Sequence, residues 1–214
     1  MQARHMTVAA LYVETGGVYY GLDDVDPWDE ERDARLYDGP YPVVAHPPCL
    51  RWGQLANVNH ARYGTLIGED GGCFQAALAA VRKYGGVLEH PANSIAWREF
   101  GLPKATRGSW TTSLSDPLGA STEVSQLVYG HGARKRTWLY AVGIDWRALE
   151  WEDRPGEYVV GAGINTGFCQ GQRLPDALAL RTPERFRDVL LSMARSVYTS
   201  RAFVCVVDES AGLA

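Results

Sequence analysis

Residues 74–89 read FQAALAAVRKYGGVLE, and they contain the clearest indication of the fold class in this sequence. Four of its apolar side chains recur at the spacing of a single α-helical face: Phe74, Ala77, Leu78 and Val81. The paired glycines after Tyr84 are a helix stop, and the apolar residues that follow them begin a strand. A helix that leads directly into a buried strand indicates a strand-helix-strand crossover, which is typical of parallel sheets.

Two apolar runs upstream of this unit predict further strands. Residues 7–13 read TVAALYV and are followed by the turn residues 14–17, ETGG, in which the glycines permit positive φ. Residues 41–45 predict a second buried strand, which must end at His46 because two prolines follow and proline cannot extend a sheet ladder. Cys49 therefore lies just past the carboxyl end of a strand.

The remaining elements are predicted from local patterns. Residues 23–38 hold eight acidic side chains and are expected to form a solvated loop with a short helix after Pro27. Residues 123–129 and 137–142 predict the two strands of a hairpin around a basic turn. Thr182-Pro183 begins a closing amphipathic helix that runs to about Val197, and residues 203–207 are expected to form a last strand.

The composition favours one compact α/β domain over residues 1–214, with a mostly parallel sheet and flanking helices. No apolar run approaches the length of a membrane span, so no membrane partner is expected. Neither a signal peptide nor a disulfide framework is visible, which favours a cytoplasmic protein with free thiols. A net charge of −4 argues against a protein that coats duplex nucleic acid, although Arg134-Lys135-Arg136 forms a local basic patch.

Two predicted strands end in residues that are capable of chemistry. Cys49 follows the first of them and Glu89 ends the second. Open α/β sheets place their binding sites beyond the carboxyl ends of their strands. A thiolate is an effective nucleophile near neutral pH, and a carboxyl group can hydrogen-bond the edge of a heterocycle. These two side chains are therefore the first candidates for a site, although a lone cysteine is more often buried and inert.

Three motifs in order resemble those of the DNA cytosine-5 methyltransferases. Residues 46–49, HPPC, resemble the Pro-Pro-Cys loop of that family, and residues 88–91, LEHP, are similar to its Glu-Asn-Val/Pro segment. Residues 129–143 resemble its Gln-x-Arg-x-Arg motif, which runs into a strand that ends in Val-Gly. The match covers roughly residues 40–145, and it implies a shortened, phage-type relative with a reduced Rossmann-like methyltransferase fold.

The resemblance implies roles for individual residues. Cys49 corresponds to the nucleophile that adds to C6 of cytosine, and Glu89 to the residue that holds the N3 and amino edge of the base. Arg134 and Arg136 correspond to the arginine pair near the base carbonyl and the cysteine loop, and are expected to depress the pKa of the thiol. The substrate side is expected to include further residues around these motifs: His46, Pro47, Pro48, Trp52, His90, Asn93 and His131.

The cofactor implied by the resemblance is S-adenosylmethionine. Its candidate contacts are the turn after the first strand and an acidic residue further on: Glu14, Gly16, Gly17 and Asp26. The turn matches the family's Phe-x-Gly-x-Gly loop only loosely, and the chain between it and Cys49 is too short for two further strand-helix units. The nucleophile half of the site is thus complete in sequence, whereas the donor half is shortened.

Residues 143–181 stand where the family carries its target-recognition domain, and they are too few for a module that grips duplex DNA. A small insertion with a binding loop at residues 161–167 is expected in its place. The expected partner is therefore a nucleotide, a single strand, or DNA that another protein presents.

Other functions remain open on the residues alone. One is a degenerate, cofactor-less relative that binds nucleotides or nucleic acid, and another is an enzyme that acts on free dCMP or dCTP. A zinc site from His46, Cys49, Cys73 and His90 lacks the usual Cys-x-x-Cys pairing, so no metal is expected. A deaminase pattern would require cysteine at Trp52. Four tryptophans are candidates for base stacking, but core packing is the commoner role: Trp52, Trp97, Trp110 and Trp138.

Overall fold

The computed structural model describes residues 6–53, 56–146, 149–160 and 172–210. Its central feature is a seven-stranded sheet with the strand order β2-β1-β3-β4-β7-β6-β5. The strands are β1 (Val8–Leu11), β2 (Val25–Trp28), β3 (Val43–Ala45), β4 (Gly86–Pro91), β5 (Thr111–Ser113), β6 (Asp116–Ser125) and β7 (Arg136–Val142). Strands β1, β2, β3, β4 and β6 run in one direction and β5 and β7 in the other, so the sheet is mostly parallel.

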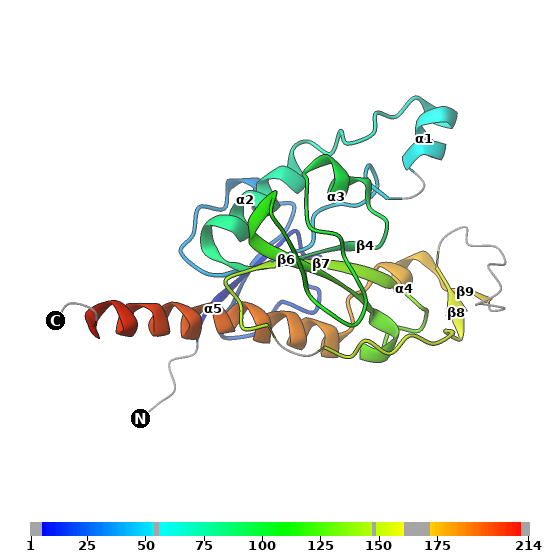
Figure 1. Ribbon diagram of the computed structural model, residues 1–214. Helices are drawn as coiled ribbons and strands as arrows, with labels where there is room; N and C mark the ends of the chain where they lie inside the picture. The colour runs from blue at the N-terminus through cyan, green and yellow to red at the C-terminus, as the bar shows by residue number, and fades with distance from the viewer. Residues whose placement is uncertain (1–5, 54–55, 147–148, 161–171, 211–214) are drawn as a thin grey trace.

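Helices cover both faces of this sheet (Figure 1). The α-helices are α1 (Ala56–Tyr63), α2 (Cys73–Tyr84), α3 (Ile95–Glu99), α4 (Asp176–Leu180) and α5 (Glu184–Ser210), and two short 3-10 helices are η1 (Ala34–Leu36) and η2 (Gln126–Tyr129). A separate two-stranded sheet pairs β8 (Tyr158–Val159) with β9 (Gln172–Arg173). No helix in the described ranges combines the length and the apolar character that a membrane crossing requires.

Side chains alternate between two hydrophobic clusters, one on each face of the sheet. Val44 and Val87 point to the cluster that α5 completes with Phe186 and Leu190. Their neighbours in β3 and β4 point to the opposite cluster, which is built on Phe74 and other residues of α2 together with Trp97 of α3. Because alternation continues past the strand ends, each residue that follows β3 or β4 can be assigned to a face.

The strand order places a switch point between β1 and β3. The chain passes from β1 to β2 on one side and then crosses to β3 on the other side of β1. In open α/β sheets, the crevice outside the carboxyl ends of the strands at such a point is where ligands bind. The end of β3 leads directly into His46, Pro47, Pro48 and Cys49.

Several predicted elements are confirmed. The apolar runs at 7–13 and 41–45 contain β1 and β3. Residues 74–89 contain most of α2, the helix stop at Gly85 and the start of β4. Gly86 has a φ of 123°, and a Cβ there would lie 1.9 Å from the carbonyl oxygen of Val43, so only glycine fits between α2 and the sheet. The closing helix is confirmed as α5, whose Phe186, Leu190, Met193 and Val197 are buried.

Three predicted elements were wrong in part. The acidic segment 23–38 contributes β2, because an edge strand pairs on one side only and therefore tolerates Pro27 and half-exposed side chains; its short helix is η1, further along. The first arm of the hairpin begins earlier, at Asp116, and residues 126–129 form η2. Residues 203–207 lie within α5, since neither glycine nor proline interrupts the helix between 184 and 210.

Candidate active site

His46 and Glu89 meet at the carboxyl ends of two neighbouring parallel strands. Ala45 of β3 pairs with Leu88 of β4, so the next residue of each strand lies side by side on the α5 face. The Nδ1 of His46 donates to the Oε2 of Glu89 over 3.0 Å. With that nitrogen protonated, Nε2 is the acceptor for the hydroxyl of Tyr19, at 2.8 Å. The two hydrogen bonds that join Tyr19, His46 and Glu89 therefore span the switch point between β1 and β3.

Glu89 is buried but remains a carboxylate. Its side chain is 11% exposed, and its Oε1 accepts from the Nε2 of Gln126 over 3.2 Å. Burial alone raises the pKa of Glu89, but the hydrogen bond from His46 and nearby positive charge, including that of Lys135, outweigh it and hold the pKa below its ordinary value. An ionised carboxylate has about four lone-pair sites, so two hydrogen bonds leave room for a ligand.

Cys49 lies in a tight turn beside this carboxylate. The prolines carry the chain out of the sheet, and the Cys49 carbonyl accepts hydrogen bonds from the amides of Trp52 (3.0 Å) and Gly53 (2.8 Å). The cysteine is half-buried and its thiol is free. Burial, and then the negative charge of Glu89, raise the pKa of the Cys49 thiol, whereas Lys135 lowers it. The negative charge of Glu89 therefore disfavours the thiolate form of Cys49.

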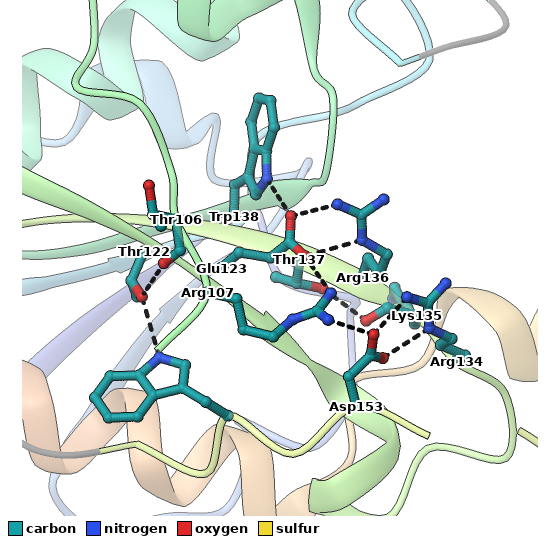
Figure 2. Close-up of polar contacts among 11 residues, drawn as sticks. Thr106, Arg107, Thr122, Glu123, Arg134, Lys135, Arg136, Thr137, Trp138 and Asp153 are labelled. Carbon is teal, nitrogen blue, oxygen red and sulfur yellow. Dashed lines mark hydrogen bonds and ion pairs between the residues drawn. The ribbon is translucent and has the colours of Figure 1, made fainter. Parts of the chain in front are cut away.

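Arg134 and Arg136 are held in ion pairs (Figure 2). Arg134 forks onto Asp153, with Nε 2.7 Å from Oδ1, and Arg136 forks onto Glu123, with Nε 2.9 Å from Oε1. Arg107 bridges the two carboxylates. The expectation that these two arginines depress the pKa of Cys49 is therefore wrong: their charges are matched by neighbouring carboxylates, and the net effect on the thiol is a raised pKa.

The alternation of the strand explains this outcome. Arg136 and Trp138 both bond to Glu123 on the α2 face, while Thr137 between them bonds to Gln126 on the Glu89 side. A shift of one residue in a strand moves a side chain to the other face. In the basic turn it is accordingly Lys135, between the two arginines, whose charge acts on Cys49 and Glu89.

The role of Lys135 can be tested on the free protein. Replacing Lys135 with methionine is expected to raise the pKa of Cys49 further, because the lowering charge is removed, and so to slow its alkylation by iodoacetamide at pH 8 several-fold. Arg134→Met is the matched control and is expected to leave the rate unchanged. Alkylation is followed by peptide-resolved mass spectrometry, which separates Cys49 from the other cysteines. Equal rates in wild type and Lys135→Met would contradict the assignment.

The predicted substrate residues separate into different places. His46 is in the site, Pro47 is buried in the loop, and Pro48 is exposed beside Cys49. Trp52 belongs to the core of the α2 face, where its Nε1 donates to Asp70 over 2.8 Å. Trp97 is likewise a core residue. These two indoles therefore pack in the interior, as their commoner role predicts.

The other three predicted substrate residues lie away from Glu89. His90 points to the opposite face of the sheet and packs against Phe74 and Trp97. Asn93 is exposed in the turn after β4, with a φ of 65°. His131 is buried, accepts from the amide of Ala133, and lines a separate surface cavity of about 670 Å³ near the start of α5. All three residues stand close to the motifs in the sequence, and that closeness did not show which of them face Glu89 in the fold.

The predicted contacts for S-adenosylmethionine do not fit the cofactor as arranged here. Asp26 is engaged by Arg32, at 2.6 Å, and by the Trp28 indole, at 2.8 Å. The turn at 14–17 is closed by a hydrogen bond from Gly17 to the Glu14 carbonyl, and a Cβ on Gly17 would lie 2.9 Å from that oxygen. Gly16 faces open space and Glu14 is exposed.

Protein side chains close the corner between the ends of β1 and β2. Asp29, directly after β2, accepts hydrogen bonds from Thr15 (2.8 Å) and Tyr20 (2.5 Å), both from the segment after β1. Those hydrogen bonds lower the pKa of Asp29 to about 2, so the carboxylate stays charged and bonded. The loop at residues 161–167 lies outside the described residues. Among the residues described, no group of three or more His, Cys, Asp or Glu side chains is placed to hold a metal ion.

Sequence reasoning missed Tyr19, Gln126, Lys135 and Thr137 as members of the site. One sequence signal could have indicated Gln126 and Thr137. Gln126 directly follows β6 and Thr137 lies near the start of β7, and both are polar residues on the same side as the apolar residues that face α5. Tyr19 gave none, because it lies in an irregular segment that only the fold brings to His46.

Comparison with known proteins found no matching family model, no matching curated protein and no matching solved structure.

Proposed function

We propose that this protein binds a cytosine-type base beside Cys49 and Glu89 and modifies it at C5 through a cysteine nucleophile, in a reduced Rossmann-like methyltransferase fold. The observation that carries the proposal is the buried carboxylate of Glu89 near the end of β4, hydrogen-bonded at 3.0 Å to His46, which follows β3 and stands three residues before Cys49. A thiol that attacks a ring and a carboxylate that holds the ring's N3 and amino edge must act on the same base, and the loop after β3 and the end of β4 bring both residues to one edge of the sheet. The order of the three sequence motifs supports the same proposal.

The chemistry follows from these two groups. The sulfur of Cys49 forms a bond to C6 of the ring, the C5–C6 double bond breaks, and its electron pair moves to C5. The proton that the thiol loses is balanced by the proton gained at N3, where it hydrogen-bonds to the carboxylate of Glu89. C5 then takes a proton, or a one-carbon group from a donor that keeps the electron pair of the bond that breaks. The original C5 hydrogen leaves as a proton to solvent, the C5–C6 double bond forms again as the C6–S bond breaks, and the proton on N3 returns to the departing sulfur.

The binding step also adjusts the nucleophile. Free Glu89 raises the pKa of Cys49 by its negative charge. A base protonated at N3 would neutralise that charge, so the thiol becomes easier to ionise when the correct base is present. His46 holds Glu89 as a carboxylate, and Lys135 favours the thiolate. Without substrate the Cys49 thiol therefore stays protonated, and substrate binding favours its ionisation.

The proposed partner is a nucleotide, a single strand, or DNA that another protein presents. The net charge of −4 is unfavourable for gripping duplex backbone without help. A trapping experiment tests the site: an oligonucleotide that carries 5-azacytosine is added to the full chain without any methyl donor. Sulfur addition at C6 with proton uptake at N5 gives a stable adduct, which we expect on the peptide that contains Cys49. The control is Cys49→Ser, for which we expect none; an adduct on another cysteine, or no adduct while free 5-aza-dCMP also fails, would count against the proposal.

A cofactor-less binding protein is the second candidate, favoured by the closed corner around Asp29. It shares the base site with the first candidate but has no electrophile to deliver. Titration calorimetry with S-adenosylmethionine separates the two. Micromolar binding would count against the second candidate, and no binding, together with tight binding of cytosine-containing oligonucleotide, would support it.

A further inference from the structure

Gln126 holds an unpaired acceptor next to the carboxylate of Glu89. The side chain is 1% exposed, and within the described chain its Oε1 has no hydrogen-bond partner. A buried carbonyl oxygen without a donor costs free energy that a folded protein normally avoids. Such a group at a candidate site points to a donor that arrives with the ligand.

Glu89 and Thr137 determine which atom of the Gln126 side-chain amide, the oxygen or the nitrogen, lacks a hydrogen-bond partner. The carboxylate of Glu89 can only accept, so it selects the amide nitrogen of Gln126, at 3.2 Å. The hydroxyl of Thr137 donates to the Lys135 carbonyl over 3.2 Å, so its lone pair also selects the nitrogen, at 3.0 Å. A flipped amide would place oxygen against two acceptors. The unpaired oxygen is therefore a consequence of the site and not of an arbitrary orientation.

The backbone holds this amide in place. The amide N–H of Gln126 donates to the Lys135 carbonyl over 2.9 Å, and its own carbonyl accepts from His131 over 3.1 Å. Gln126 is thus tied at both backbone groups to the turn that carries Lys135. A buried side chain with a fixed backbone loses little entropy on binding, which suits it to recognition.

We propose that Gln126 determines the specificity of the site: its Oε1 accepts one N–H of the exocyclic amino group of the base, while Glu89 accepts the other. This inference rests on the proposed function. The two hydrogens of an amino group diverge by about 120°, so their acceptors lie about 5 Å apart. The amide nitrogen of Gln126 is 3.2 Å from the Oε1 of Glu89, so the Oε1 of Gln126, on the same amide group, lies beside the carboxylate and can accept from the second hydrogen of an amino group that Glu89 binds. Uracil would instead aim its O4 at both acceptors and be rejected.

The wild-type protein provides the first test. A single-stranded oligonucleotide with one variable position is titrated against the full chain, with cytosine, N4-methylcytosine or uracil at that position. The methyl group removes one of the two N–H donors in either of its orientations. We expect N4-methylcytosine to bind about 10-fold more weakly than cytosine, which corresponds to one buried acceptor left unpaired. Equal affinity for the two would overturn the inference while leaving the proposed function standing, whereas failure of cytosine itself to bind would remove both.

A pair of variants gives the second test. In Gln126→Met the preference for cytosine over 2-pyrimidinone, which lacks the amino group, is expected to fall about 10-fold. Ser125→Ala is the matched control, because Ser125 is the adjacent residue and its buried hydroxyl also has no partner in the part of the chain that the structure describes. The control is expected to keep the wild-type preference. An unchanged preference in folded Gln126→Met would overturn the inference, and the N4-methylcytosine result stands even if this variant does not fold.

Discussion

Glu89→Gln is expected to slow addition of Cys49 to a cytosine ring by about 100-fold or more, because a neutral amide cannot stabilise the ring protonated at N3. The same variant is expected to alkylate faster with iodoacetamide, since the negative charge that raises the pKa of the thiol has been removed. The two rates therefore move in opposite directions. Adduct formation with 5-azacytosine oligonucleotide and peptide-resolved alkylation measure them on one preparation.

Glu123→Gln is the matched control for that experiment. Glu123 is a buried carboxylate in β6, separated from β4 by β7, and it faces the arginines and Trp138 on the other side of the sheet (Figure 2). Its replacement is expected to leave both rates at Cys49 unchanged. If both rates fell together in Glu89→Gln, the variant would have damaged the loop, and a direct role for the carboxylate in ring chemistry would lose its support.

His90 is expected to make the fold acid-sensitive. Its ring is fully buried on the α2 face, where it packs against Phe74 and Trp97. Burial lowers the pKa of His90 from 6.5 to about 4, with Glu89 acting weakly in the opposite direction. Between those two pH values the imidazole of His90 binds a proton in the unfolded chain but stays neutral in the folded protein. Stability is therefore complete above pH 6.5 and falls by about 3 kcal/mol as the pH drops to 4.

The measurement is denaturant unfolding at intervals between pH 7.5 and 5.5, a range above the pH of about 5 at which carboxylates with lowered pKa values, such as Glu89, Glu123 and Asp153, begin to contribute. His90→Phe is expected to flatten most of the slope, with a remainder of the same sign from His131, whose pKa burial also lowers. His60→Gln, at an exposed position, serves as control. A slope equal in wild type and His90→Phe would show that the buried imidazole is not its source.

Much of the central architecture was predictable because it depends on short-range patterns. Consecutive residues determine the periodicity of α2, the helix stop at Gly85-Gly86 and the strand that follows. Local sequence also determines where the chain leaves the sheet, at the two prolines after β3. The pairing of β3 with β4 then follows, and it brings His46 and Glu89 together. Edge strand β2 was missed because its weakly apolar sequence owes its conformation to β1 and not to its own pattern.

The site was predictable only in part, because side-chain direction depends on register. Cys49 and Glu89 were identified from their positions at strand ends, whereas Arg134 and Arg136 were assigned from a motif that did not fix which residues face inward. The structure turns Lys135 and Thr137 toward Glu89 and pairs the arginines with Asp153 and Glu123. Tyr19 and Gln126 required the assembled sheet, since each contacts its partner across a long sequence separation.

Hydrogen exchange at C5 tests the central claim most directly, since it needs only the nucleophile and the carboxylate and no cofactor. Cytosine-containing oligonucleotide, and separately dCMP, are incubated with the full chain in D₂O, and deuterium at C5 is measured by mass spectrometry. Addition of Cys49 to C6 makes C5 exchangeable, so we predict incorporation with wild type and none above background with Cys49→Ser. Binding of cytosine without any exchange at C5, or exchange that persists in Cys49→Ser, would contradict the account.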